Sequence, residues 1–191
     1  MKKLLVFLLI TTVISASAQE NSASKAPGSH NIYLGIGTGI ESFSGLIGVT
    51  ADIKAAEKLF VRLGAGIGGW GGKLSAGIRG EKSTGNSIGY GAFFSYASGL
   101  SSFTTNLETT TGDRDVNLKL SPAMVFTPEF SYKWVFGNGH KLFIAAGYGV
   151  LLQKDRWKVL DGSILTDTSK KTLNILTPGG VSVGLGLQFA L

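Results

Sequence analysis

The chain contains no cysteine, few charged residues and no long apolar run beyond its N-terminus. Without a thiol it can form no disulfide and cannot carry the lipid-modified cysteine of a lipoprotein. Charged residues make up only 16% of the sequence, and the net charge of +6 is scattered, so a nucleic-acid partner is not expected. After residue 18 no apolar stretch approaches the roughly 20 residues of a membrane-spanning helix, which excludes a helical membrane protein.

The N-terminus carries the three parts of an export signal in order. Lys2 and Lys3 give a basic start, Leu4–Ile14 is apolar, and Ser15–Ala18 offers an Ala-x-Ala cleavage site before Gln19. The apolar run is too short to cross a bilayer as a helix. We therefore predict a cleaved signal peptide at 1–18, a flexible N-terminus at 19–30 and a single domain at 31–191.

Apolar residues alternate with small ones along most of that domain. Alternation with a period of two is typical of strands that have one apolar face. The other face is rich in glycine, of which the chain has 28, and the mean hydropathy of +0.24 is high for an exported chain. The pattern predicts an all-β fold, an eight-stranded antiparallel up-and-down transmembrane β-barrel. The expected strands are 32–40, 47–53, 59–68, 74–79, 88–96, 118–134, 142–150 and 181–191.

The lengths of the connections agree with such a barrel. An even strand count places both termini on one side, so the second, fourth and sixth connections are periplasmic, and all three are brief. The two long connections, Ser98–Asp115 and Gln153–Gly179, both fall on the predicted outer side. The alternative is a soluble lipocalin-like barrel with its apolar face turned inward around a ligand. Its water-facing surface would then consist largely of glycine, which disfavours it.

The last strand adds a resemblance to known proteins. Val181–Leu191 is apolar at every second residue, like the insertion signal of bacterial outer-membrane proteins, although it ends in Leu191 with Phe189 two residues earlier. The whole mature chain resembles the OmpX/OmpA-type small barrels. The Ala-Ser-Ala-Gln cleavage region and the Gly-rich strands resemble the outer-membrane β-barrel proteins of Bacteroidetes. The resemblance implies a Gram-negative outer membrane, with membrane lipid, lipopolysaccharide and the barrel-insertion machinery as partners.

Charged residues on the inward phase form the first candidate site. Five of them converge on one level of the predicted barrel, and a confined charge is costly unless it is paired. We expect a salt-bridge plug; a gate or solute site is the alternative. An eight-stranded barrel is just wide enough for side chains to fill, so a general porin is not expected. The residues are Asp52, Arg62, Arg79, Glu129 and Lys133.

The sequence shows no catalytic, cofactor or metal motif. The two histidines, His30 and His140, fall at predicted periplasmic ends without a serine beside them on a strand face. The Gly-x-Gly steps lack the following helix of a dinucleotide site. We therefore predict no enzyme, no cofactor and no metal, with a lipid-modifying enzyme as a lesser alternative.

Aromatic residues and prolines mark the expected membrane boundaries. Tyr132, Trp134 and Phe136 fit an interfacial girdle at the periplasmic end, and Trp70 near Phe43 fits one at the outer end. Pro122 and Pro128 interrupt the sixth strand. We expect either a bulge there or a strand that leaves the membrane near Pro122 as an exposed ribbon.

The long outer loops are the second candidate site. A mixed-charge segment with a central tryptophan, Arg156, Trp157 and Lys158, could bind lipopolysaccharide, a host surface or a partner protein; a solvated variable loop is the alternative. We expect a structural or surface-interaction protein, with an adhesion or envelope role through these loops. The alternative is a narrow conduit for small or hydrophobic solutes.

Overall fold

The computed structural model describes residues 30–82, 85–153 and 156–191. The predicted signal peptide at 1–18 and most of the predicted flexible N-terminus lie outside the described residues. Among the described residues no helix is long and apolar enough to cross a membrane.

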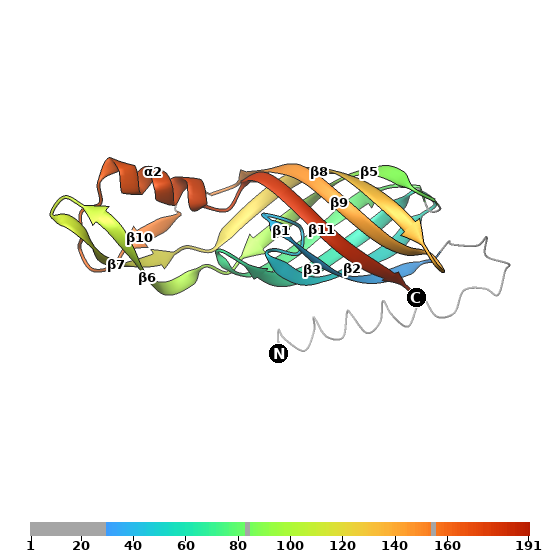
Figure 1. Cartoon of the computed structure of the whole chain (residues 1–191), viewed down its shortest axis with the longest axis horizontal. Helices are drawn as coiled ribbons and strands as arrows, with labels where there is room; N and C mark the ends of the chain where they lie inside the picture. Colours follow the sequence, from blue (N-terminus) through green and yellow to red (C-terminus); the bar gives the residue numbers. More distant parts are fainter. Residues whose placement is uncertain (1–29, 83–84, 154–155) are drawn as a thin grey trace.

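Eight antiparallel strands close into a barrel in the order β1-β11-β9-β8-β5-β4-β3-β2, with β2 pairing back onto β1 (Figure 1). The predicted fold class is confirmed. Apart from the closure of the barrel between β1 and β11, neighbours in the barrel are neighbours in the chain except where β5 pairs with β8 and β9 pairs with β11. The barrel strands are β1 (Ile32–Ile40), β2 (Ile47–Ala56), β3 (Leu59–Gly68), β4 (Gly71–Gly80), β5 (Ser87–Ala97), β8 (Ala123–Phe136), β9 (His140–Leu151) and β11 (Gly180–Ala190).

The alternation in the sequence becomes an inside and an outside. On β1, Tyr33 faces inward and is fully buried, whereas Ile36 faces outward and is 56% exposed. The same alternation continues around the barrel, with small, polar and charged residues and a few aromatic rings inside, and large apolar residues outside. Glycine on the inward phase leaves the narrow interior free for larger side chains from other strands.

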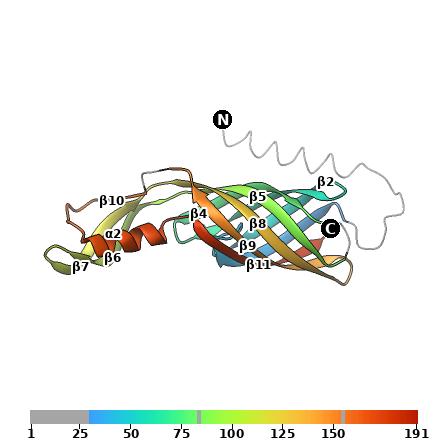
Figure 2. The same cartoon turned by 90° about the horizontal axis from the view of Figure 1, so that it is seen from above.

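The two departures from neighbour pairing build a second unit at one end of the barrel, which we call the head (described residues of 98–122 and 152–179). It holds β6 (Leu100–Thr109), β7 (Gly112–Leu120), β10 (Trp157–Val159) and α2 (Asp167–Leu176). The three strands form a sheet in the order β10-β7-β6. Both views show the head projecting from the barrel along its long axis, away from Leu191 (Figures 1 and 2).

The head has a hydrophobic core of its own. Val116, Leu118 and Leu120 of β7 pack in one cluster with Leu165 and Leu173, the latter on α2. The helix begins after Thr166, whose side chain accepts a hydrogen bond from the Ser169 amide, a typical N-cap.

Trp70 and Phe43 do not form an outer girdle, so that prediction is wrong. Trp70 is buried in the head core and donates a hydrogen bond through Nε1 to the Ser121 carbonyl, at 2.8 Å. Phe43 is buried inside the barrel. Each of these short connections buries its aromatic residue, Trp70 in the head core and Phe43 inside the barrel. Neither side chain is therefore available at a membrane interface.

The sixth predicted strand divides into two elements. β7 ends at Leu120, Pro122 follows, and β8 begins at Ala123 in a different sheet. The register of β8 with β9 is the same before and after Pro128, so no bulge forms there. Of the two predicted outcomes, the structure therefore has the one in which the strand leaves the barrel at Pro122.

Candidate functional site

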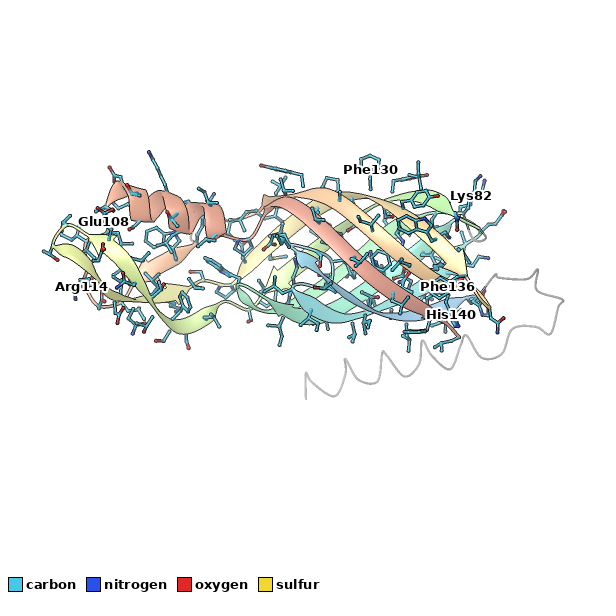
Figure 3. The ribbon with its side chains drawn as sticks, in the orientation of Figure 1. Lys82, Glu108, Arg114, Phe130, Phe136 and His140 are labelled. Atoms are coloured by element: carbon cyan, nitrogen blue, oxygen red, sulfur yellow. The ribbon has the colours of Figure 1, made fainter. Side chains whose placement is uncertain are left out.

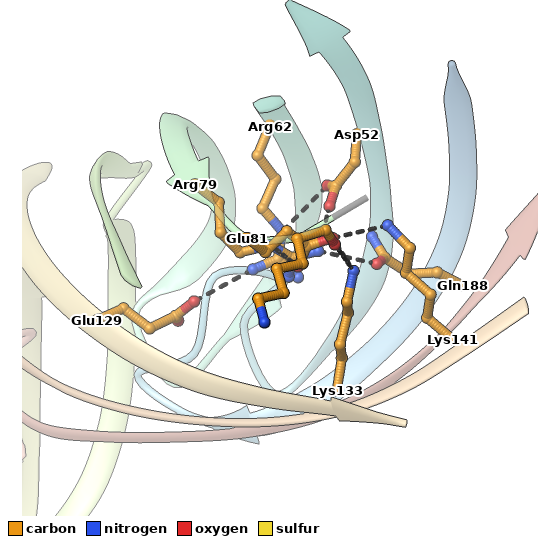
Figure 4. Close-up of polar contacts among 9 residues, drawn as sticks. Asp52, Arg62, Arg79, Glu81, Glu129, Lys133, Lys141 and Gln188 are labelled. Atoms are coloured by element: carbon orange, nitrogen blue, oxygen red, sulfur yellow. Dashed lines mark hydrogen bonds and ion pairs between the residues drawn. The ribbon is translucent and has the colours of Figure 1, made fainter. Parts of the chain in front are cut away.

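The interior of the barrel, in the half nearer Leu191, holds a network of ion pairs to which five strands contribute (Figure 4). Arg62 Nε lies 3.2 Å from Asp52 Oδ1, and Arg62 Nη1 lies 3.2 Å from Glu129 Oε1. Arg79 Nη2 lies 2.6 Å from Asp52 Oδ2. All four side chains are at most 6% exposed, so each charge depends on its partners rather than on water.

Glu81 joins this network to two lysines. Its carboxylate lies 3.0 Å from Arg79 Nε, 3.1 Å from Lys133 Nζ and 2.7 Å from Lys141 Nζ. The structure thus brings together all five residues predicted from the sequence, and it adds Glu81, Lys141 and Gln188. The Gln188 amide oxygen accepts from Arg79 Nη2 at 3.1 Å.

The three missed residues carried a usable signal. Lys141 lies on the inward phase of β9, two residues before the buried Phe143, and Gln188 lies on the inward phase of β11. The expected strand began only at residue 142, so Lys141 fell in the preceding connection. Glu81 continues the inward phase of Arg79 one residue beyond the end of β4. Extending the alternation past the apolar residues would have found all three.

Aromatic rings flank the cations. The Arg62 guanidinium carbon lies 4.5 Å from the Phe43 ring centre and 4.6 Å from the Phe143 ring centre. Lys141 Nζ lies 3.4 Å from the centre of the Tyr33 ring and also faces Phe60. Cation–π contacts of this kind gain strength where water is excluded.

The connection between β1 and β2 folds into the mouth of the barrel. Phe43 packs edge-on against Phe93 at 4.9 Å between ring centres, directly above Arg62. Glu41 starts the inward turn in the left-handed region, with φ of 48°, and its carboxylate lies 3.6 Å from Lys73 Nζ. The sequence predicted this segment only as a short outer connection.

Glycine makes room for this inward loop. A Cβ added at Gly64 would lie 2.5 Å from the Phe43 ring, and one added at Gly184 would lie 3.0 Å from Ser42 Cβ. The Ser182 hydroxyl donates to the Glu41 carbonyl at 3.0 Å and holds the loop to β11. The sequence pattern assigned the small inward residues to a narrow lumen. Some of them instead make room for the inward loop and contact it.

Little space remains beside the ion pairs. A cavity of about 10 Å³ is lined by Phe43, Arg62, Arg79 and Glu129 among others, which is about the volume that a single water requires. A larger cavity of about 140 Å³ lies above the inward loop and is lined in part by Glu41, Lys73 and Trp70. Arg62 Nη2 and Arg79 Nη1 are buried and have no hydrogen-bond partner within the described residues.

The histidines lie where the sequence places them, at the end of the barrel near Leu191. His30 Nδ1 lies 3.0 Å from the Leu191 carbonyl oxygen, and His140 Nδ1 accepts from the Ala190 amide at 3.2 Å. Figure 3 shows His140 beside Phe136 at that end. No group of three or more potential metal ligands occurs in the described part of the chain.

The loop candidates belong to the head sheet. Trp157 is half-buried against the head core, and its Nε1 donates to Asn174 Oδ1 at 3.3 Å. Lys158 is exposed and lies directly opposite Lys119 of β7. Arg156 is half-buried, and its carbonyl accepts from the Ser121 amide at 3.0 Å. The tryptophan therefore supports the sheet, whereas the two cations lie on its other face.

No protein-family model matches the chain, and no curated protein matches it. Among solved structures, the crystal structure of Acinetobacter baumannii CarO is similar over 87% of this chain and 100% of that chain, with a TM-score of 0.44 and 10% sequence identity. That similarity is too low to indicate a function.

Proposed function

We propose that the chain is an integral β-barrel protein of the bacterial outer membrane, with a closed lumen and a structural or surface-interaction role carried by its head. The observation that carries this proposal is the surface of the barrel. On the eight barrel strands every charged side chain lies on the inward phase of the alternation. These residues are Asp52, Lys54, Arg62, Lys73, Arg79, Glu129, Lys133 and Lys141.

The outward phase is apolar over a height that fits a membrane. On β8, Met124 and Trp134 both face outward, at 44% and 40% exposed, and ten residue steps separate them. At ~3.3 Å per residue and a strand tilt of roughly 40°, they rise about 25 Å along the barrel axis. Apolar bands of outer-membrane barrels are about this tall.

Aromatic residues lie near both limits of this band. Tyr132, Trp134 and Phe136 face outward near the Leu191 end, and Tyr96 and Tyr148 face outward near the head. Amphipathic rings favour the boundary between hydrocarbon and water. The two sets support a barrel that crosses the membrane from the Leu191 end to the head.

The interior supports a closed lumen rather than a conduit. Ion pairs fill the barrel at one level, and the inward loop with Phe43 lies on top of them. A soluble lipocalin-like barrel would have the opposite distribution, with apolar residues inside and charges outside. The head, as a folded unit with its own core, is the part that is free to meet a partner.

Heat-modifiability tests the membrane assignment. The chain is refolded into detergent, and unboiled and boiled samples are compared on SDS gels with circular dichroism on the same material. We expect a compact, faster-migrating unboiled band and a strand-dominated spectrum. A chain that stays soluble without detergent and shows no shift would contradict the proposal and favour the lipocalin-like alternative.

Planar-bilayer recording tests the closed lumen separately. The wild-type barrel is expected to give no steady conductance because ion pairs and Phe43 occupy its interior. The Arg62→Ala/Phe43→Gly variant removes one bulky side chain from the ion-pair network and the ring that lies on top of it, and should open measurable steps. Steady conductance in the wild type would contradict the closed lumen and support the narrow conduit.

A further inference from the structure

Three cations lie together on the outer face of the head sheet. Lys119 of β7 and Lys158 of β10 are directly opposite each other in the register, and both are exposed. Arg156 continues the register by one step beyond Trp157, since its carbonyl accepts from Ser121. Because strand side chains alternate, Arg156 lies on the same face as Lys158. We call these three residues the rim cluster.

Among the described residues, the rim cluster has no anionic partner of its own. No ion pair joins Lys119, Arg156 or Lys158 to an acidic group within residues 30–82, 85–153 and 156–191. Like charges directly opposite each other on adjacent strands destabilise a sheet. An external anion between the two lysines would remove that repulsion.

The cluster lies at the end of the head sheet that adjoins the barrel. Lys119 is four residues before Ala123, where β8 enters the barrel, and Arg156 is five residues after Leu151, where β9 leaves it. Four residues of extended chain span about 13 Å. The headgroup layer beyond the hydrocarbon edge is about 5–8 Å thick on each side, and lysine and arginine side chains can reach back into it.

The opposite end of the same face is acidic. Glu108 of β6 lies directly opposite Asp113 of β7, and Asp115 accepts a hydrogen bond from Asn106. Figure 3 shows Glu108 near the end of the head that is farther from the barrel, together with Arg114, which by strand alternation lies on the other face of the sheet. The face is therefore basic toward the membrane and acidic away from it, which is the distribution that an anionic membrane surface favours.

We infer that the rim cluster binds the phosphorylated headgroup of an outer-leaflet lipid, with one phosphate held between Lys119 and Lys158. This inference rests on the proposed outer-membrane function. Arg156 completes the site from the side nearer the bilayer, where a guanidinium can bind a phosphate in bidentate fashion. The bound lipid would fix the height and orientation of the head above the membrane.

The test compares two triple variants of the full chain. Lys119→Gln/Arg156→Gln/Lys158→Gln removes the rim cluster. The matched control, Lys82→Gln/Lys170→Gln/Lys171→Gln, removes the same charge from the other end of the barrel and from α2. Only heat-modifiable preparations are used, and they are kept in uncharged detergent. Each is titrated separately with bis-phosphorylated lipid A, with dephosphorylated lipid A and with inorganic phosphate. Native mass spectrometry measures the binding.

Wild type and control should bind phosphorylated lipid A with equal affinity. A cation near an anionic membrane surface contributes about fivefold in affinity, so the rim-cluster variant should lose roughly a hundredfold. Dephosphorylated lipid A should bind wild type as weakly as phosphorylated lipid A binds the variant, and millimolar phosphate should not compete.

Three outcomes would overturn the inference. These are equal affinities of the two triple variants, equal affinities of the two lipids, or effective competition by inorganic phosphate, which would indicate a free-anion site instead. Failure of heat-modifiability would contradict the proposed function itself. A heat-modifiable barrel without lipid preference would contradict this inference alone.

Discussion

The barrel and the head distribute the same kinds of residue in opposite ways. In the barrel Arg79 is buried and Ile36 is exposed, whereas in the head Leu118 is buried and Lys119 is exposed. Both units are built from antiparallel strands with alternating side chains. The local geometry is therefore shared, and the two units differ in which face carries the apolar side chains, as expected if lipid surrounds the barrel and water surrounds the head.

The two strands on either side of Pro122 show this most directly. Apolar side chains occupy even-numbered positions in both, for example Leu118 in β7 and Phe130 in β8. Leu118 lies in the head core, whereas Phe130 faces outward and is 70% exposed. The same alternation thus points its apolar side chains into the head core before Pro122 and onto the outer surface of the barrel after it.

The largest expected effect comes from breaking the charge network inside the barrel. Arg79→Met leaves Asp52 and Glu81 short of a partner in a buried site, which should cost about 3–5 kcal/mol of unfolding free energy. Urea unfolding in lipid vesicles, followed by the gel shift, measures it. Lys170→Met, which removes an exposed ion pair with Asp167, should cost less than about 1 kcal/mol. Equal losses in the two variants would contradict the role of the network.

Truncating the head core should destabilise the head without opening the barrel. Leu118 is fully buried, and Leu118→Ala should cost about 2–5 kcal/mol through lost burial and a new cavity. Limited proteolysis should then cleave the variant in the head while the barrel band keeps its heat-modifiability. Loss of the barrel band together with the head would show that the two units fold as one.

A charge placed on the outward face distinguishes the two surfaces. Leu185 lies midway along β11 and is 47% exposed, so Leu185→Arg should cost about 2–4 kcal/mol if lipid surrounds it. Phe103→Arg, at a comparably exposed position of the head, should change stability by no more than about 0.5 kcal/mol. Unfolding of both variants in vesicles measures the contrast. A tolerated arginine at Leu185 would argue that water reaches the barrel wall.

The smallest expected effect is a pH dependence confined to the head. The nearby hydroxyl of Ser163 and the backbone amides of Asn117 and Ser163 lower the pKa of Asp161 to about 2. A lowered pKa stabilises the fold above the unfolded value of about 3.9, and this contribution is lost as the pH falls through about 2. The protection factor of the Asn117 amide should fall over that range. Asp161→Asn should make it independent of pH.

The sequence was sufficient for the barrel because alternation with a period of two repeats on eight strands. It was also sufficient to bring Asp52, Arg62 and Glu129 together, since their phase and depth follow from strand position. The head was not predicted as a folded unit, because its β6 strand has little alternation and its core draws on Trp70 and Leu173 from distant segments. Phe43 was misplaced because no local pattern shows that a short turn folds inward.

The central claim is that lipid surrounds the barrel and water surrounds the head. Because the chain contains no cysteine, single spin labels can be placed at Phe130→Cys, Ser131→Cys and Phe103→Cys in vesicle-inserted protein. The label at 130 should be accessible to oxygen and not to a water-soluble nickel complex, the label at 131 to neither, and the label at 103 to the nickel complex. Access of the nickel complex to the label at 130 would contradict the claim.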